Sequence, residues 1–321
     1  METKLIKPLQ QLPVPVLLMV FNRLETSRVV FEEIKKARPE KLYVACDGPR
    51  KERIGESEKV CTVREYIIKN IDWPCSVQTL FRNENLGCKT AVSGAISWFF
   101  ENEEKGIILE DDTVPNQSFF NFCAELLEKY EDDHQIWHIG GINFHNGKIW
   151  GDGSYYLSAF AHIWGWASWR RAWSKYRAEV SKEDIVSALD FLGLLRMPQR
   201  TIEYFAEKFE MTRQGKINTW DYQWNIAMWK HQKFAILPNV NLVTNIGYGM
   251  AEATHTSQTN EIAFLANHEI PKLVHPVKLK HQKLADRQIS KKYFYSFSLL
   301  RRVFQKFKKL VRVVLSAFGK I

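Results

Sequence analysis

The sequence predicts an α/β fold, in which a mostly parallel central sheet is flanked by helices and a basic amphipathic helix follows at the C-terminal end. Three observations lead to this prediction. Strand-like and helix-like segments alternate over residues 14–112, polar residues follow each predicted strand, and the residues from Lys291 onward are rich in Lys and Arg. Such alternation is typical of βαβ units, whose strands are parallel and whose helices cover both faces of the sheet.

Four strands are expected in the first part of the chain. They are apolar or alternating runs that end in polar or turn residues, at 14–22, 41–48, 75–83 and 105–112. The segments between them have the apolar period of a helix, at 24–37, 56–70 and 86–102. Ligands of parallel α/β sheets bind outside the carboxyl ends of the strands, where this sequence places Arg23, Asp47 and Glu110.

The second part of the chain is less regular. A strand with a Gly-rich turn is expected at 136–144, and an aromatic-rich segment with a helical end at 162–176. Residues 181–211 and 219–232 are predicted helices, and 234–247 a predicted strand. We expect one domain over 1–285, with a first half at 14–112 and a second half at 113–260, and a tail over 286–321.

Composition fits a globular enzyme and argues against nucleic acid as a partner. The chain has 321 residues, of which 45% are hydrophobic, and its eleven Trp are expected mostly in the core. The net charge of +9 lies in the tail, because residues 291–321 hold all of the excess of Lys and Arg. A nucleic-acid footprint would spread basic residues over the fold itself.

The sequence favours a cytoplasmic location. Its first residues lack the apolar stretch of a signal peptide, and the run PVPVLLMVF is too short to span a bilayer. The five Cys are an odd number without a CxxC pair, which suits a reducing compartment.

Three adjacent carboxylates, Glu110, Asp111 and Asp112, end the fourth predicted strand. One interpretation is a solvated loop, in which Asp112 caps the helix that follows and Pro115 lies near its first turn. The other is a metal site, since Mg²⁺ and Mn²⁺ prefer carboxylate oxygen and bridge protein to a diphosphate. Both stay open at this point.

Several motifs resemble one enzyme family. They are PVLLMVFNR (15–23), VACDG (44–48), NLGCKTAVSGAISWFF (85–100), IILEDDTVPNQSFFNF (107–122), WGWASWRRAW (164–173) and TWDYQW (219–224). Together they resemble the Rossmann-like GT-A glycosyltransferases, and among them the N-acetylglucosaminyltransferase I-like enzymes, over about residues 14–256. This resemblance implies a nucleotide-sugar donor and Mn²⁺ (or Mg²⁺) as the cofactor.

The resemblance also implies roles for single residues. Arg23 would approach the diphosphate, Asp47 would accept from the N3–H of uracil, Glu110 and Asp111 would lie on the ribose side, and Asp112 would be the metal ligand. Asn22 stands where the family often has an acid, in the same donor-binding loop.

Two further residues are candidates for the donor and metal sites. Lys89 opens a predicted helix, where its cation is placed to reach phosphate or to lie exposed. His255 follows a Gly-bearing loop and is a candidate contact of the metal or diphosphate.

Inverting glycosyl transfer needs a general base, and Asp221 in TWDYQW is the candidate. Aromatic neighbours would raise its pKa. The alternative is that Asp221 caps the helix that follows. Segments 141–147 and 162–169 are expected to line the acceptor and donor-sugar side, with Trp164 and Trp166 either stacking on a sugar or packing in the core.

The tail has its own signature. Over residues 296–318, Leu, Val and Phe recur at helical spacing opposite Lys and Arg, which is typical of a helix that lies on an anionic membrane surface. The predicted function is therefore an inverting, metal-dependent glycosyltransferase, peripherally bound to the inner face of the cell membrane. It would move a UDP-linked sugar such as N-acetylglucosamine to a lipid-linked or cell-surface glycan.

Two alternatives remain open. One is a sugar-1-phosphate nucleotidyltransferase, although the segment FNRLETS lacks that class's Gly-rich loop. The other is a non-catalytic membrane-surface protein.

Overall fold

The structure is a computed structural model that describes residues 11–247 and 265–294. Within this part of the chain, an eight-stranded sheet runs in the order β3-β2-β1-β4-β8-β6-β9-β7, and β5 and β10 form a small second sheet. The strands are β1 (Val16–Val20), β2 (Lys41–Cys46), β3 (Ser76–Phe81), β4 (Lys105–Glu110), β5 (Thr113–Pro115), β6 (Ile136–Gly140), β7 (Tyr155–Ser158), β8 (Trp166–Trp169), β9 (Phe234–Pro238) and β10 (Val243–Asn245).

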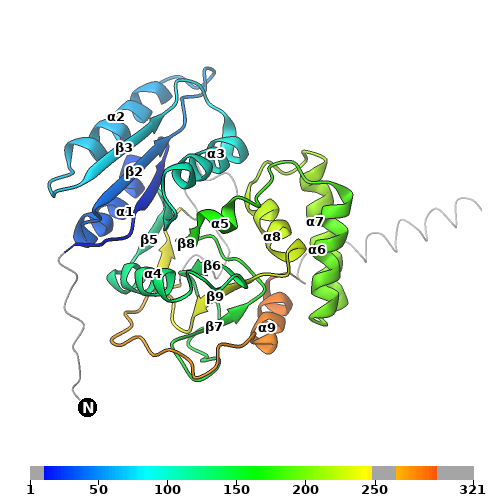
Figure 1. Cartoon of the computed structure of the whole chain (residues 1–321). Helices are drawn as coiled ribbons and strands as arrows, with labels where there is room; N and C mark the ends of the chain where they lie inside the picture. Colours follow the sequence, from blue (N-terminus) through cyan, green and yellow to red (C-terminus); the bar gives the residue numbers. More distant parts are fainter. Residues whose placement is uncertain (1–10, 248–264, 295–321) are drawn as a thin grey trace, which may run out of the picture.

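Helices cover both faces of the large sheet (Figure 1). They are α1 (Leu24–Ala37), α2 (Glu56–Lys69), α3 (Gly87–Asn102), α4 (Gln117–Lys129), α5 (Arg170–Trp173), α6 (Lys182–Leu194), α7 (Gln199–Arg213), α8 (Asp221–Lys230) and α9 (Lys283–Tyr293).

The α/β fold class is confirmed. Strands β3, β2, β1 and β4 are all parallel to one another, as the alternation of strands and helices predicts. Beyond β4 the sheet is mixed, because β8 is antiparallel to both β4 and β6, while β6 and β9 are parallel. Strands β2 and β3 are added on one side of β1, whereas β4 is added on its other side. The gap between β1 and β4 is therefore the topological switch point of the sheet.

Two apolar cores lie on the two faces of the sheet, because successive strand residues point to opposite sides. On one face, Leu17, Met19 and Ile108 pack with α3, α5 and the helices α6 to α8. On the other face, Val16, Leu18 and Leu109 pack with α1, α2 and α4. Both faces of the N-terminal strands are therefore buried, which explains their continuous apolar sequence.

The second half differs from the sequence prediction in several elements. The predicted helix 181–211 is two helices, because Pro198 disfavours helical backbone at Met197 and Arg196 has a left-handed φ of 52°. The predicted strand 234–247 is also split, since β9 ends at Pro238 and β10 pairs with β5 in the small sheet. Strands β7 and β8 were not predicted, as each is only four residues long.

Most Trp side chains are core residues, as expected. Nine of the eleven are buried, and five of these are among the largest fully buried side chains, namely Trp166, Trp169, Trp220, Trp224 and Trp229. Trp98 and Trp164 are half-buried. For Trp166 the packing interpretation is therefore the right one.

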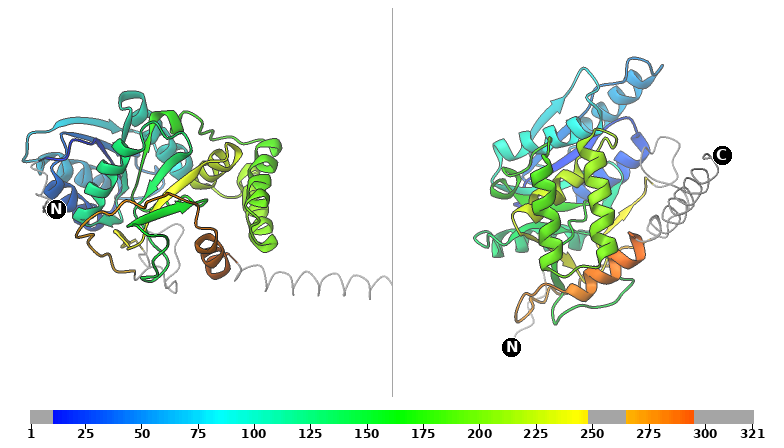
Figure 2. Two further views of the ribbon diagram at one scale, coloured as in Figure 1. Left: turned by 60° about the horizontal axis from the view of Figure 1, so that its bottom comes forward. Right: turned by 90° about the vertical axis from the view of Figure 1, so that its right-hand side faces the viewer.

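Residues 265–282 run along the bottom of the molecule and lead into α9 beside β7 (Figures 1 and 2). The buried carboxylate of Asp286 fixes this helix. It accepts hydrogen bonds from Ser158 Oγ (2.6 Å) and from the backbone N–H of Ala159 (2.8 Å), and His281 Nε2 lies 2.7 Å from it. The predicted boundary between domain and tail, at 285/286, thus falls inside a helix that is packed on the fold.

No helix in the described part of the chain is long and apolar enough to cross a membrane. The amphipathic segment 296–318 lies outside the described residues. All five Cys are free thiols.

Replacing Asp286 with Ala should lower the free energy of unfolding by about 3 kcal/mol, because Ser158 and Ala159 would lose their buried acceptor. Chemical denaturation at pH 7 measures this change. Gln288→Ala, on the exposed side of the same helix, is the control and should change stability by less than about 0.5 kcal/mol. A loss below about 1 kcal/mol for Asp286→Ala would show that α9 is not held by this carboxylate.

Candidate functional site

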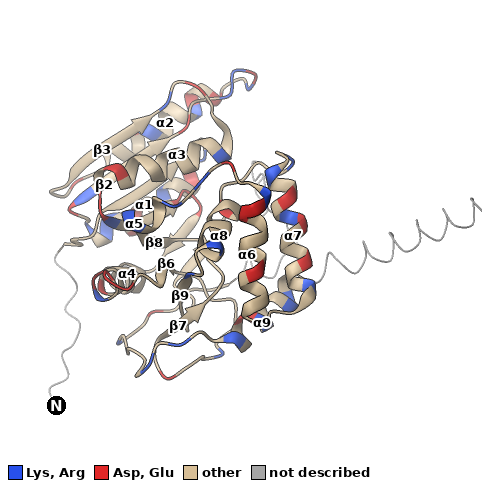
Figure 3. Cartoon of the chain, turned by 45° about the vertical axis from the view of Figure 1, so that its right-hand side comes forward, with Lys and Arg blue, Asp and Glu red and all other residues tan. Residues whose placement is uncertain are grey.

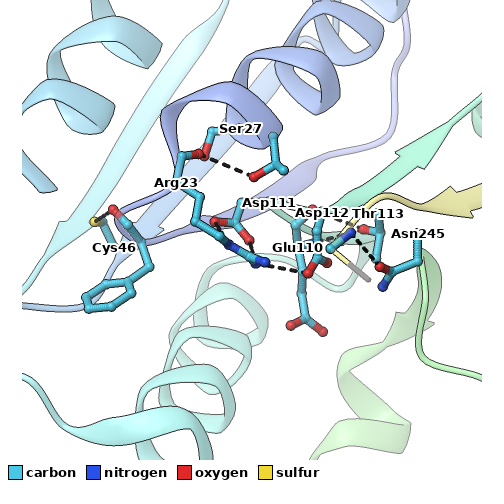
Figure 4. Close-up of polar contacts among 11 residues, drawn as sticks. Arg23, Ser27, Cys46, Glu110, Asp111, Asp112, Thr113 and Asn245 are labelled. Carbon is cyan, nitrogen blue, oxygen red and sulfur yellow. Dashed lines mark hydrogen bonds and ion pairs between the residues drawn. The ribbon is translucent and has the colours of Figure 1, made fainter. Parts of the chain in front are cut away.

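The switch point between β1 and β4 brings Arg23 against the carboxylates that end β4 (Figure 4). Arg23 Nη2 contacts Asp111 Oδ1 and lies 2.9 Å from Asp112 Oδ2. The residue precedes α1 directly, and its carbonyl oxygen accepts hydrogen bonds from Ser27 Oγ (2.6 Å) and Ser27 N (3.1 Å). The backbone is thereby fixed, and the guanidinium is free to span both Asp side chains.

Burial and like charge together perturb these carboxylates. Burial raises the pKa of Asp111 to about 6, although the charge of Arg23 opposes this shift. Burial, and then the charges of Asp112 and Asp111, raise the pKa of Glu110 to about 8. The carboxyl group of Glu110 points away from the Arg23 pair (Figure 4). The site therefore holds its negative charge mainly on Asp111 and Asp112, next to one guanidinium.

The segment after β10 closes over Asp112. Ile246 N donates to the carbonyl oxygen of Asp112 (2.8 Å), and Asn245 Oδ1 accepts from Gly247 N (2.9 Å). A Cβ on Gly247 would lie 2.2 Å from Asp112 Oδ2, so only glycine fits here without a shift of the carboxylate. Gly247 is the last described residue before 248–264, the range that contains His255.

A cavity of about 470 Å³ opens beside this cluster, between the carboxyl ends of β1, β2 and β4 and the helix α3. Its size and its mixed lining are typical of a small-molecule site. Apolar residues such as Ala45, Ala91 and Val92 line it. Its polar and charged lining residues are Arg23, Asp47, Arg50, Arg82, Asn85, Glu110, Asp111 and Asn218.

Asp47 lies in this cavity, where the sequence places it. Its carboxylate accepts hydrogen bonds from the backbone N–H of Leu86 (3.0 Å) and Gly87 (3.2 Å) at the start of α3. Burial raises its pKa, and these N–H groups oppose the shift. A half-buried carboxylate that faces the cavity retains lone pairs for a ligand N–H.

Asn22 does not line the cavity. It is 7% exposed, and its Nδ2 donates to Glu56 Oε1 (2.9 Å). Glu56 is buried as well, and accepts from Arg50 N (2.7 Å) and Arg50 Nε (2.9 Å). Asn22 therefore contacts the cavity only indirectly. It hydrogen-bonds to Glu56, and Glu56 in turn positions Arg50, which lines the cavity.

Lys89 does not line the cavity either. Its Nζ lies 2.5 Å from Glu179 Oε1, in the second half of the chain. Its backbone N–H donates to Asn218 Oδ1 (3.3 Å). The predicted cation at this position is therefore turned toward the second half, where it ties the start of α3 to the segment before α8.

Asp221 is the first residue of α8 and lines a second cavity of about 200 Å³. Thr219 Oγ1 donates to its Oδ1. The negative charge of Asp221 also raises the pKa of Glu110 and of Cys88, both of which line the first cavity. The fold thus brings Asp221 into the electrostatic neighbourhood of the carboxylate cluster, although 108 residues lie between Asp112 and Asp221 in the sequence.

Aromatic side chains form most of the second cavity. Phe144, Phe160, Trp164, Tyr222 and Phe294 line it with a few polar groups. Segments 141–147 and 162–169, which the sequence analysis placed near the acceptor, both contribute to it.

Both capping alternatives are wrong. Asn116, not Asp112, caps α4, because its Oδ1 accepts from Phe119 N (3.0 Å). Pro115 belongs to β5 and precedes the helix. The N-cap of α8 is Trp220, whose side chain makes no capping hydrogen bond, and Asp221 is the first residue of the helix itself. The carboxylate of Asp112 therefore has no capping role that would account for it.

The residues present fit a divalent cation that is shared with a ligand. In residues 11–247 and 265–294, no group of three or more His, Cys, Asp or Glu side chains is arranged to hold a metal. Mg²⁺ and Mn²⁺ are commonly held by one or two carboxylates together with substrate phosphates, so Asp112 and a diphosphate suffice. His255 lies outside the described residues.

Two buried histidines, His138 and His145, lie close to His162, which lines the second cavity. Burial lowers the pKa of His138 and of His162 to about 3, and that of His145 to about 4. Trp224 Nε1 donates to His138 Nδ1 (3.3 Å), and His138 Nε2 lies 3.0 Å from the carbonyl oxygen of His162. Neither ring nitrogen of His145 has a hydrogen-bond partner in the described residues.

The site candidates from the sequence leave out four polar residues that line the cavity, namely Arg50, Arg82, Asn85 and Asn218. Arg50 follows the Asp-Gly turn after β2, so the rule that ligands bind at strand ends would have pointed to it. Asn218 reaches the cavity only through its long-range contact with α3, and no local pattern marks it.

Comparisons with known proteins give only distant likenesses. No family model matches the chain, and no curated protein matches its sequence. It is similar to a mannosyltransferase from Pyrobaculum calidifontis in complex with GDP-Man and Mn²⁺, at 12% identity over 70% of each chain with a TM-score of 0.39.

Two further solved structures are similar at the same level. HddC from Yersinia pseudotuberculosis shares 11% identity over 52% of this chain and 82% of its own, with a TM-score of 0.31. UDP-glucose pyrophosphorylase complexed with UDP-glucose shares 11% over 70% of this chain and 90% of its own, with a TM-score of 0.34. These values are too low to place the chain in a family, so the resemblance to N-acetylglucosaminyltransferase I-like enzymes stays a prediction.

Replacing Arg23 with Gln should lower the free energy of unfolding by about 3 kcal/mol, because the buried carboxylate of Asp111 and the partly buried one of Asp112 would lose their cation. Urea denaturation at neutral pH measures the loss. Arg28→Gln is the matched control, since Arg28 is exposed on α1, the helix that Arg23 precedes, and lies 3.9 Å from Glu25. Equal stability of the two variants would show that the Arg23 pairs do not hold the site.

Stability should fall as pH decreases from about 6.5 to 4, because His145 has a folded pKa of about 4 and an unfolded pKa of about 6.5. The unfolded chain then binds protons that the folded chain does not. His145→Leu should remove about 1.4 kcal/mol per pH unit from this slope. Unfolding measured at pH 7, 6 and 5 tests it, and an unchanged slope would contradict the assignment.

Proposed function

We propose that this protein is an inverting, metal-dependent glycosyltransferase that uses a nucleotide-sugar donor. The observation that carries the proposal is the cluster of Arg23, Asp111 and Asp112 at the switch point of the sheet. Arg23 and Asp111 of this cluster line a cavity of about 470 Å³, and Asp112 lies directly beside them. A diphosphate at this place would meet the guanidinium of Arg23 and a cation on Asp112. Arg50 and Arg82 add positive charge to the same lining.

The donor is proposed to lie with its base toward Asp47 and its diphosphate toward Arg23. The carboxylate of Asp47 would accept from an imide N–H, which favours a UDP-linked sugar such as UDP-N-acetylglucosamine. Glu110 and Asp111 would lie on the ribose side. A bound Mn²⁺ or Mg²⁺ would neutralise charge on the departing diphosphate.

Asp221 is proposed as the general base. The acceptor oxygen forms a bond to the anomeric carbon while the bond from that carbon to the diphosphate oxygen breaks. The proton of the acceptor hydroxyl goes to the carboxylate of Asp221, and the bonding electrons leave with the nucleoside diphosphate. One displacement inverts the anomeric configuration. The aromatic cavity at Asp221 is the proposed place of the acceptor, a lipid-linked or cell-surface glycan.

We place the protein at the cytoplasmic face of the cell membrane, to which the basic segment 296–318 would bind. The sugar-1-phosphate nucleotidyltransferase alternative uses the same kind of cavity but a different bond, between the α- and β-phosphates. The two reactions leave different products from a nucleotide sugar, so one assay separates them.

The test is turnover of a panel of nucleotide sugars, with Mn²⁺ and with EDTA. We expect metal-dependent release of nucleoside diphosphate from one donor, and a loss of about 100-fold or more in Asp112→Asn, whose side chain cannot hold the cation as a carboxylate does. Asp190→Asn, an exposed carboxylate on α6, is the matched control. Formation of nucleoside triphosphate on addition of pyrophosphate would instead establish the nucleotidyltransferase.

Asp221→Asn should bind the donor as tightly as the wild type but transfer sugar about 100-fold to 10,000-fold more slowly. Titration calorimetry with the nucleoside diphosphate, alongside the turnover assay, separates binding from chemistry. If transfer continues at the wild-type rate, Asp221 is not the base.

A further inference from the structure

The surface around α9 is strongly basic. We define the α9 face as the exposed parts of residues 148–153, 194–196 and 272–292. These segments carry nine Lys or Arg, namely Lys148, Arg196, Lys272, Lys278, Lys280, Lys283, Arg287, Lys291 and Lys292. They contain two acids, of which Asp286 is buried and hydrogen-bonded inside the fold, so that Asp152 is the one exposed acid among them.

Contacts join these segments into one surface. Lys148 Nζ donates to Gln288 Oε1 (3.3 Å), which brings the loop before β7 against α9. Arg287 Nη2 donates to the carbonyl oxygen of Arg196 (2.7 Å), which brings the turn between α6 and α7 against its other side. The lower part of the molecule, around α9 and β7, shows this basic character in Figure 3.

Three cations of the α9 face have no ion-pair partner within the described part of the fold. No ion pair in the described part of the chain involves Lys272, Lys278 or Lys280. Desolvation, and then the neighbouring positive charges of Arg287 and Arg196, lower the pKa of Lys283. Positive side chains are therefore close together on this part of the α9 face. Such a concentration of positive charge implies an anionic partner.

Exposed apolar side chains lie among these cations and decide which anionic partner fits. Val277 is 95% exposed, Leu284 64% and Val274 46%, and Ile149 and Leu194 are also exposed. A nucleic-acid surface offers phosphates but no apolar layer for such groups. The interface of an anionic bilayer offers both, since basic side chains meet lipid headgroups while apolar ones enter the acyl boundary.

We propose that the α9 face of the folded domain docks on an anionic lipid bilayer. This goes beyond the predicted amphipathic segment 296–318, because the face consists of folded residues. Phe294 follows α9 directly and lines the cavity of Asp221, so the docked face borders that cavity. A membrane-held acceptor would thus enter from the bilayer, a consequence that rests on the proposed function, whereas the docking does not.

The test is partition of the full chain onto vesicles of phosphatidylcholine with phosphatidylserine, titrated below saturation and without any donor. Lys278→Glu with Lys280→Glu should weaken partition at least about 25-fold, since each Lys near an anionic leaflet contributes roughly a fivefold attraction. The binding free energies of separate segments add, so their contributions to the partition coefficient multiply. The fold-loss caused by the two Lys substitutions is therefore measurable even if segment 296–318 also binds the vesicles.

Matched variants make the outcome specific. Lys59→Glu with Lys69→Glu makes the same charge change on exposed positions of α2, at the other end of the molecule, and should leave partition within about twofold. Val277→Ser with Leu284→Ser should weaken partition without any charge change. Thermal unfolding confirms that each variant is folded.

Three results would overturn the proposal. One is equal partition of wild type and Lys278→Glu/Lys280→Glu. Another is an equal loss in the α2 control, which would indicate net charge alone. The third is binding to duplex DNA that is as tight as to vesicles and insensitive to Val277→Ser/Leu284→Ser, which would make the partner a nucleic acid. None of these results depends on whether sugar is transferred.

Discussion

The neighbouring carboxylates at the end of β4 are the constraint on which the site depends. Like charges at adjacent positions repel, and burial increases the cost because less water screens them. Arg23 offsets this cost by contacting Asp111 and Asp112 from the start of α1. The contact joins the first and fourth strands at the switch point of the sheet. The first and last strands of the segment 14–112 therefore meet around one guanidinium, and the cavity opens beside it.

The aromatic packing of the second half has a comparable role for Asp221. Trp220 and Trp224, both buried, flank it in the sequence. Trp220 stacks on Trp166 of the sheet, and the ring of Trp224 packs against Trp166 in a tilted arrangement. A rigid apolar core thus fixes the first turn of α8, and the carboxylate is left at the boundary of a cavity. An inflexible support of this kind is what a positioned general base requires. Besides burial, the negative charge of Asp221 raises the pKa of Cys88 and of Glu110, which both belong to the first half of the chain.

Helix α9 links the fold to the surface we propose for the membrane. Its buried carboxylate, Asp286, is fixed from β7, while its exposed side carries only basic, polar and apolar groups. The one acidic side chain of α9, Asp286, is buried, and its Lys and Arg side chains are at the surface. The contact that holds the helix on the fold therefore does not reduce the positive charge of its exposed side. The same helix ends at the rim of the cavity of Asp221, through Phe294. The cavity of Asp221 and the basic face are therefore neighbours in the fold.

The sequence alone determined the α/β class, the first four strands and the carboxylate cluster, because strand periodicity and strand-end polarity are local properties. It also placed Asp47 correctly at the cavity. Only the tertiary structure decided that Asn22 and Lys89 turn away from the cavity, toward Glu56 and Glu179, and that Asn116 caps α4. These outcomes depend on which partner lies within hydrogen-bond distance, and such partners are far apart in the chain.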